Sequence, residues 1–289
     1  MNKKNEKLMA DIHRILEKQN FKSEKDLRKF LDNLVGQQIP SFEADELSAK
    51  EQAVDLVYEA YELSPAKGKA KVEIALQLDP DCIEAYLYLG EMEKTAEIAM
   101  VFFEKGIAIG RRIFGGKYLK EHKGMFWGFH ETRPFMQCLQ QYSDCIYTIG
   151  KIEECVAILE EMIELNPNDN QGVRDQLLLY LIQLDEREKF EKYAKQYEHD
   201  DLAFSLFNRA LFAFKIEGET TNSNKKLKNA IKRNKFIAPK IITNRPVSDL
   251  PEMYGIGNKD EAQNYVYFAQ HIWYQTKGAV TWLKKHSKR

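Results

Sequence analysis

Residues 135–169 read "FMQCLQQYSDCIYTIGKIEECVAILEEMIELNPND" and decide the fold. Apolar residues recur at helical spacing in both halves: Leu139, Tyr142 and Ile146 in the first, and Cys155, Leu159 and Met162 in the second. Gly150 falls between the halves, and Pro167 marks the end of the second because proline cannot continue a helix. The stretch therefore predicts a hairpin of two helices joined by a tight turn.

These spacings resemble the tetratricopeptide repeat, a helix-turn-helix unit of about 34 residues. Ser143 stands in the place usually taken by glycine and Cys155 in the place of alanine, where paired helices approach closely. Residues 75–106 form a looser unit, in which Pro80 precedes the first helix. Degenerate third and fourth units follow at residues 170–197 and 201–234.

A helix hairpin buries only one face, so such units stabilise each other by stacking, and a curved stack leaves a concave groove. We predict an all-α fold, a helical-hairpin solenoid of degenerate tetratricopeptide-like repeats. The predicted parts are an N-terminal helical extension at 1–45, the repeats at 46–245 and a C-terminal helical cap at 246–289. The alternative is an irregular helical bundle whose repeat-like spacing arose by chance.

Helix ends can be predicted near the start of the chain. Ser23 and Gly36 bound a helix that carries its apolar residues on one face, namely Leu27, Phe30, Leu31 and Leu34. Ser48 and Glu51 have the spacing of a capping box, which begins another helix. The polar stretch between these helices contains Pro40 and predicts a short connector.

Composition limits the class of protein. Lys and Arg number 43 and Asp and Glu 44, a formal charge of -1, so global charge predicts no polyanion or membrane partner. The first residues lack the apolar core of a signal peptide, and no run of about 18 apolar residues occurs. The four cysteines have no CxxC spacing. We expect a cytoplasmic protein with reduced thiols.

Three segments together carry a narrower resemblance: FWGFHETRPFM (126–136), EMIELNPNDNQGVR (161–174) and residues 230–283. They resemble bacterial tetratricopeptide-like relatives of the eukaryotic suppressor-of-tumorigenicity-seven family. In that family a final repeat runs into NP-x-VP-x-YLL, a polar linker, an EA-x-x-Y helix and a GAL-x-x-L helix. These features recur, with departures, at Asn234–Ile242, Glu261–Tyr265 and Gly278–Leu283. The resemblance implies a helical scaffold and provides no catalytic residues.

A ligand groove can be predicted from the repeat register, because positions 2, 5 and 9 of each first helix face the concave side in tetratricopeptide proteins. The polar residues there are Gln137, Gln140, Asp144, Gln171, Arg174 and Arg209. Their side chains suit hydrogen bonding to an extended peptide or its carboxylates. They do not reproduce the lysine- and asparagine-rich clamp that grips acidic chaperone tails. The alternative is an ordinary solvated helix face.

The aromatic stretch at 124–136 has two interpretations. In the structural one, Thr132 caps a helix starting near Arg133, Pro134 lies in its first turn, and Phe126, Trp127 and Phe129 fill a junction. In the functional one, Trp127, His130 and Arg133 stand at the mouth of the groove and form a recognition loop. They would then offer a stacking surface and an anion fork.

A basic stretch supports a second class of partner. Residues 220–247 contain no Asp or Glu but include Lys225, Lys226, Lys228, Lys232, Arg233 and Lys235. Nucleic acid or another polyanion could dock there. Against this, lysine-rich helix faces commonly serve only solubility.

Catalytic motifs are weak. Neither HETRP (130–134) nor EHKG (121–124) matches HExxH, and GIGNKD (255–260) lacks the third glycine of a dinucleotide fingerprint. Cys138 and Cys145 lie one heptad apart with His130 nearby in sequence, which leaves a Cys–His nucleophile open, although buried cysteine in a repeat interface is commoner. We predict a non-enzyme with no metal and no cofactor.

The sequence thus predicts a non-catalytic scaffold or adaptor that holds a peptide or helix of another protein in its groove. The alternative is a nucleic-acid-associated regulator that binds through Lys225–Arg245.

Overall fold

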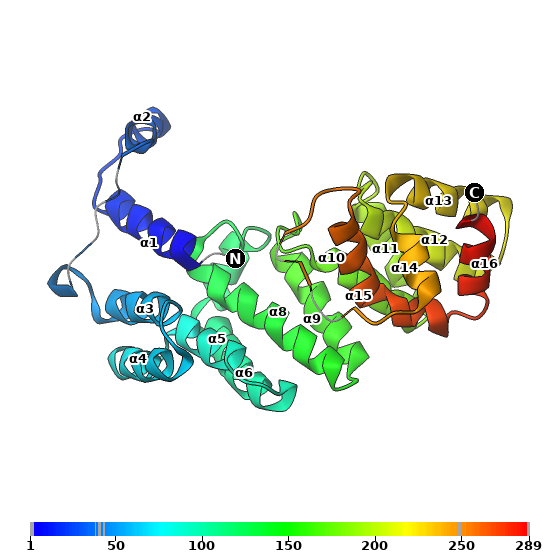
Figure 1. The fold of residues 1–289 in the computed structure, drawn as a ribbon. Helices are drawn as coiled ribbons and strands as arrows, with labels where there is room; N and C mark the ends of the chain where they lie inside the picture. Colours follow the sequence, from blue (N-terminus) through cyan, green and yellow to red (C-terminus); the bar gives the residue numbers. More distant parts are fainter. Residues whose placement is uncertain are drawn as a thin grey trace. The chain divides into compact units, whose positions relative to one another are not determined.

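The structure, a computed structural model, describes residues 3–37, 39, 42, 44–247, 250–251 and 253–287. In the predicted connector, Pro40 lies outside these residues, whereas Ala44–Glu46 at its end forms a 3-10 turn. Within them the chain forms sixteen α-helices and two short 3-10 turns, and no strand (Figure 1). The all-helical prediction is confirmed. The helices gather into two compact units, residues 1–168 and 169–289, and each is described by itself.

Unit 1 contains nine helices among its described residues: α1 (Lys3–Glu17), α2 (Glu24–Leu34), α3 (Ala49–Ala60), α4 (Pro65–Leu78), α5 (Ile83–Glu91), α6 (Ala96–Ile113), α7 (Gly116–His122), α8 (Arg133–Thr148) and α9 (Ile152–Leu165). The 3-10 turns Ala44–Glu46 and His130–Thr132 precede α3 and α8. Helix α3 packs on α4, α5 on α6, and α8 on both α6 and α9.

Unit 2 contains seven helices among its described residues: α10 (Val173–Gln183), α11 (Arg187–Gln196), α12 (Ala203–Glu217), α13 (Thr221–Arg233), α14 (Ile237–Thr243), α15 (Lys259–Gln275) and α16 (Ala279–Ser287). Helix α10 packs on α11, α12 and α15, and α12 packs on α13. Every residue of α10 from Leu177 to Ile182 is buried, so this helix is the centre of the unit.

The predicted helix ends of the N-terminal region are confirmed. The Ser23 side chain accepts a hydrogen bond from the Asp26 amide, and α2 stops just before Gly36, which has a φ of +79°. Ser48 and Glu51 form the capping box of α3. The apolar face of α2 is present as predicted, but none of the helix's residues is buried.

The four predicted helix pairs are all formed, as α5 with α6, α8 with α9, α10 with α11, and α12 with α13. Small residues allow the closest approaches. A side chain at Gly90 of α5 would run into the Phe103 ring of α6, and a Cβ on Gly106 would lie 2.7 Å from the Cys138 sulfur of α8. These pairs agree with helical hairpins. Helix α7 and its flanking loops are inserted in the sequence between α6 and α8, although these two helices pack on each other.

The C-terminal segments that carried the family resemblance hold unit 2 together. Asn234 donates through Nδ2 to the Glu261 carboxylate at 2.8 Å, and both residues are buried. The Trp273 indole donates to the Tyr265 hydroxyl at 2.9 Å. Trp273 also stacks with Trp282 of α16, with ring centroids 6.3 Å apart. The motif residues Asn234, Glu261 and Tyr265 are therefore structural in this chain.

Candidate functional site beneath the N-terminal helix

Helix α1 presents a charged face to the rest of unit 1. Among residues 6–17 the buried ones are Glu6, Ala10, Asp11 and Arg14, each 6–7% exposed. Their spacing places them on one side of the helix. The neighbouring apolar residues Leu8 and Met9 are 43% and 41% exposed. Because this helix buries three charged residues while its apolar residues Ile12, Ile15 and Leu16 are only half-buried, specific polar contacts contribute much of its attachment.

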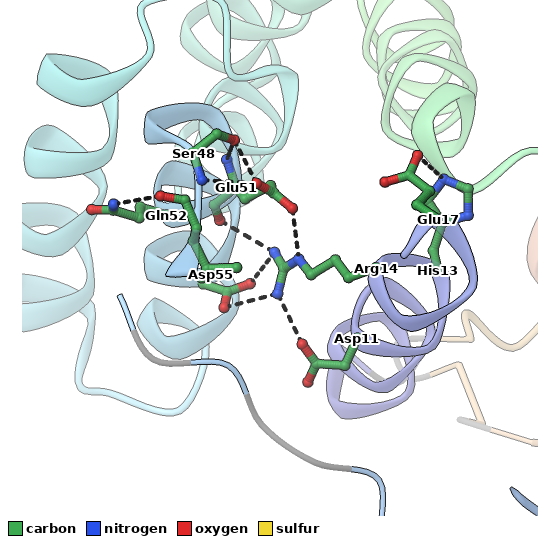
Figure 2. Close-up of polar contacts among 9 residues, drawn as sticks. Asp11, His13, Arg14, Glu17, Ser48, Glu51, Gln52 and Asp55 are labelled. Carbon is green, nitrogen blue, oxygen red and sulfur yellow. Dashed lines mark hydrogen bonds and ion pairs between the residues drawn. The ribbon is translucent and has the colours of Figure 1, made fainter. Parts of the chain in front are cut away.

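Arg14 makes the first set of those contacts (Figure 2). Its guanidinium lies between two carboxylates: Nη1 is 2.8 Å from Asp11 of the same helix, and Nη2 is 2.7 Å from Asp55 of α3. Nη2 also donates to the Glu51 backbone carbonyl, and Nε lies 3.4 Å from the Glu51 carboxylate. Arg14, Asp11, Glu51 and Asp55 form what we call the Arg14 cluster.

The charges of the Arg14 cluster depend on one another. Burial lowers the pKa of Arg14, but hydrogen bonds and charges from Asp55 and Asp11 outweigh it, so the pKa is raised overall. Burial raises the pKa of Asp11 although the Arg14 charge acts against it. The pKa of Glu51 is lowered, first by its hydrogen bond with the Ser48 hydroxyl. The capping box of α3 therefore also favours the ionised form of the Glu51 carboxylate, which lies opposite Arg14.

Glu6 makes the second set of contacts, about two helical turns from Arg14. One of its carboxylate oxygens lies 3.4 Å from His130 Nε2 and 3.7 Å from Arg133 Nη1. His130 Nε2 also lies 3.2 Å from the Glu6 carbonyl oxygen. Two of the residues predicted to form a recognition loop, His130 and Arg133, thus contact a helix of the same chain.

The surface under Glu6 is polar and incompletely filled. Tyr58 of α3, Glu84 of α5 and Gln137 of α8 line a cavity there with Glu6 and Arg133, and it has room for about one water molecule. Burial raises the pKa of Glu84. Tyr58 is 6% exposed, and its pKa is raised chiefly by burial. We call six of the residues that contact or face α1 the docking surface: Asp55, Tyr58, Glu84, His130, Arg133 and Gln137.

The aromatic stretch also forms a junction. Phe126 is 1% exposed and lies among Phe114, Tyr118 and Phe135. The prediction that Thr132 caps α8 is wrong: its side chain makes no cap bond, and its hydroxyl donates to the Phe126 and Phe129 carbonyls instead. The hydroxyl is turned into the preceding loop, because residues 130–132 form a 3-10 turn.

Trp127 takes part in the same arrangement. Its carbonyl accepts a hydrogen bond from Arg133 Nε at 3.1 Å, and the Arg133 guanidinium lies 5.7 Å from the Trp127 ring centroid. The half-buried indole thus helps to hold Arg133 in place for Glu6.

The other predicted groove residues of unit 1 follow Gln137 along α8. Gln140 is half-buried, and its carbonyl accepts the Ser143 hydroxyl. Asp144 lines a different hollow, with Gly90, Lys94 and Phe103. Burial raises the pKa of Asp144 to about 7. Of the three predicted positions on α8, the structure therefore brings only Gln137 to the docking surface.

In unit 2 the predicted arginines make internal contacts. Arg174 Nη1 lies 2.9 Å from Asp169, and Arg174 Nε lies 2.9 Å from Asp200; we call these three residues the Arg174 cluster. Arg209 donates to the Ala194, Tyr197 and Glu198 carbonyls, and burial lowers its pKa.

The remaining position of the predicted groove is Gln171, which is half-buried at the turn before α10. Arg174 and Arg209 both reach Tyr197: the Arg174 guanidinium lies 5.4 Å from its ring centroid, and Arg209 bonds to its carbonyl. Both arginines thus contact Tyr197 at the end of α11, and their bonds hold the chain between α11 and α12.

The basic stretch lies mainly on α13. Lys225, Lys228 and Lys232 are exposed at a helical spacing that places them on one face, and Lys235 is exposed just beyond the helix. Lys226 is half-buried and lines a hollow of about 390 Å³ with Phe190, Arg209 and Ile216. Arg233 lies 3.4 Å from Asp201.

Three of the four cysteines, Cys82, Cys145 and Cys155, lie where burial disfavours the thiolate. Cys82, Cys138, Cys145 and Cys155 are free thiols. Burial raises the pKa of Cys145 to about 11 and that of Cys155 to about 12, whereas a nucleophilic thiol needs a lowered pKa. In the described part of the chain, no group of three or more His, Cys, Asp and Glu side chains is arranged to hold a metal ion. Nor does any helix there have the length and apolar character needed to span a bilayer.

Sequence reasoning missed the α1 side of this site. Glu6, Ala10 and Arg14 are spaced four residues apart, a pattern that could have indicated one functional face. Their partners on α3 and near α8 are 37 or more residues away, so the sequence carries no local sign of the pairing.

Comparison with known proteins adds no relative: no family model, curated protein or solved structure matches this chain. The resemblance to the suppressor-of-tumorigenicity-seven family therefore stays a prediction.

Proposed function

We propose that this protein is a non-catalytic scaffold that binds a helix of another protein on its docking surface, where its own α1 acts as a resident ligand. One observation carries the proposal: α1 lies on predicted binding residues through Glu6 to His130 and Arg133. The hairpins α5–α6 and α8–α9 would act as tetratricopeptide-like repeats that present this surface.

The polar character of the contact supports exchange of α1 for another helix. Ion pairs that are largely buried contribute little net free energy, because the attraction between the charges is offset by loss of their hydration. Ala10 is the only fully buried apolar residue among residues 6–17, and Ile12, Ile15 and Leu16 are half-buried, so release of α1 uncovers no large apolar core. A partner helix with a better apolar face could displace it.

The contacts of α1 define the chemistry of that partner. Its helix would carry an acidic residue opposite His130 and Arg133, a small residue one turn later, and an arginine after a further turn opposite Asp55. This is the spacing of Glu6, Ala10 and Arg14. Helix-in-groove recognition commonly uses anchors at such one-turn intervals.

The test measures binding of α1 in trans by fluorescence anisotropy. A labelled peptide of residues 3–20 is titrated with the wild-type chain and with a full-length Glu6→Gln/Arg14→Gln variant, whose own α1 is loosened. We expect the peptide to bind the variant at least about tenfold more tightly, because the tethered wild-type α1 competes at an effective concentration on the order of millimolar.

Two controls sharpen this test. Arg28→Gln removes an exposed ion pair with Glu24 on α2 and should leave the peptide excluded, as in the wild type. Adding Asp55→Asn and Arg133→Gln to the loosened variant should abolish binding. The proposal fails if the peptide binds none of the chains, or binds all of them equally.

A second candidate function is polyanion binding by the lysine face of α13. It is favoured because Lys225, Lys228, Lys232 and Lys235 are exposed and form no ion pair within the described residues. Binding of a short DNA duplex should then weaken steeply with salt, since phosphate contacts release counterions. Lys228→Gln/Lys232→Gln should reduce that slope by about two, and a slope unchanged by both substitutions would reject this candidate.

A further inference from the structure

Unit 1 contains another cavity, apart from the docking surface and from the hollow beside Asp144. It has a volume of about 340 Å³ and lies among the end of α6, α7, the start of α8 and the end of α9. Its floor is aromatic: Phe114, Phe126 and Phe135 all line it, with ring centroids 6.2–6.3 Å apart. Leu119 and Leu165 complete the apolar wall. The volume is within the range of sites that hold small molecules.

The residues that line this cavity include charges of both signs. Arg111 at the end of α6 and Lys123 after α7 supply the cations, and Glu161 and Glu164 of α9 supply the anions. Arg111 Nη2 lies 2.7 Å from Glu161, and Lys123 Nζ lies 2.9 Å from Glu164. Two parallel ion pairs thus border an aromatic pocket.

These ion pairs can be replaced at little cost. The side chains of Arg111 and Lys123 are 53% and 54% exposed, and exposed pairs add little to stability. A ligand with a positive and a negative group close together could pair with both sides of the rim at once. A ligand with one charge could pair with only one side, and it would leave a carboxylate or a cation of the rim without its partner.

We propose that this cavity binds a free amino acid with a large apolar, preferably aromatic, side chain. The α-carboxylate would pair with Arg111, whose planar guanidinium offers two parallel donors, and the α-ammonium would pair with Glu161. The side chain would then lie on Phe114, Phe126 and Phe135, where edge-to-face contacts between rings are favourable.

The test is isothermal titration calorimetry on the full-length protein with L-phenylalanine as the probe. Three comparators each remove one feature: N-acetyl-L-phenylalanine has no ammonium, L-phenylalaninamide has no carboxylate, and L-alanine has no ring. We expect saturable binding of L-phenylalanine and at least a tenfold loss with each comparator. The proposal would be overturned if the acetyl and amide compounds bound as tightly as L-phenylalanine, or if L-phenylalanine gave no saturable heat.

Variants locate the binding site. Arg111→Gln and Glu161→Gln should each weaken L-phenylalanine binding at least tenfold, and Leu119→Trp should abolish it by filling the cavity from α7. The matched control is Glu191→Gln, which breaks an exposed ion pair with Arg187 on α11 and should leave affinity unchanged. Affinity that is unchanged in all three cavity variants would contradict this site.

Discussion

Two arginines, one in each unit, are held by the same chemistry in different surroundings. Arg14 lies between Asp11 and Asp55 in unit 1, and Arg174 lies between Asp169 and Asp200 in unit 2. Each guanidinium makes close ion pairs with two carboxylates that are at most 13% exposed. On the ion pairs alone, the two clusters would be expected to contribute similarly to stability.

The difference lies in the helices that carry them. Helix α10 begins one residue before Arg174 and buries an unbroken run from Leu177 to Ile182, so unit 2 is held by apolar packing and the Arg174 cluster fixes its end. Among residues 6–17 of helix α1, Ala10 is the only fully buried apolar residue, so the Arg14 cluster and the Glu6 contacts are a large part of its attachment. The same kind of ion pair thus fixes the end of a core helix in one unit and, on the proposed function, holds an exchangeable helix in the other.

The largest effect is expected from Arg174→Ala. It leaves Asp169, 1% exposed, and Asp200, 10% exposed, without their cation. Removing one partner of a buried ion pair costs about 3–5 kcal/mol. Urea denaturation should therefore report a large loss in the free energy of unfolding. The control is Arg187→Ala on the exposed face of α11. If Arg174→Ala lowered the free energy of unfolding by less than about 1 kcal/mol, the Arg174 cluster would not differ from an exposed ion pair.

A smaller global effect is expected from Arg14→Ala. Because α1 can leave the surface, Asp11 and Asp55 regain water, and we expect a loss of only about 1–2 kcal/mol. The main consequence should be local, namely faster limited proteolysis within residues 3–22. The control is Arg28→Ala on exposed α2. If Arg14→Ala destabilised unit 1 as much as Arg174→Ala destabilises unit 2, α1 would be part of the core.

The smallest effect concerns Asp144 of unit 1 and is pH-dependent. Burial raises its pKa from 3.8 in the unfolded reference to about 7, so the folded protein keeps a proton that the unfolded chain has already released. The resulting stability is complete below pH 3.8 and is lost as the pH rises through 7. Asp144→Asn should therefore be more stabilising at pH 8 than at pH 5, by about 1 kcal/mol after allowing for solvent screening, because the loss is only partial at pH 5.

Thermal unfolding at the two pH values measures this. Asp175 of unit 2 provides a comparison. Burial raises its pKa to about 7 as well, even though the nearby Arg174 charge acts in the opposite direction. The same stabilisation of Asp144→Asn at pH 5 and at pH 8 would show that Asp144 is ionised throughout this range.

Local features of the fold could be predicted from the sequence. The Ser48 capping box, the stop before Gly36 and the four helix pairs depend on residues within one hairpin, so spacing and residue type were sufficient. Thr132 was mispredicted because a serine or threonine before a helix can also donate to the carbonyls of the preceding loop.

The site was less predictable because it depends on distant pairs. His130, Arg133 and Gln137 were singled out, but no pattern linked them to Glu6, which lies 124 residues before His130. Arg174 was predicted to face a ligand. In the structure the Asp169 carboxylate instead accepts hydrogen bonds from the Arg174 guanidinium and from the first amides of α10. Asp169 has a φ of +49°, and the sequence alone did not reveal this arrangement.

The most direct test of a detachable α1 is native-state hydrogen exchange on the full-length protein. We predict that the amides of α1 exchange through a local opening that costs several kcal/mol less than the opening of α8 in the same unit. Arg14→Ala should remove the protection of α1 and leave that of α8 unchanged. If α1 and α8 exchange with the same free energy in the wild type and lose protection together in the variant, α1 belongs to the core and the proposed docking surface is wrong.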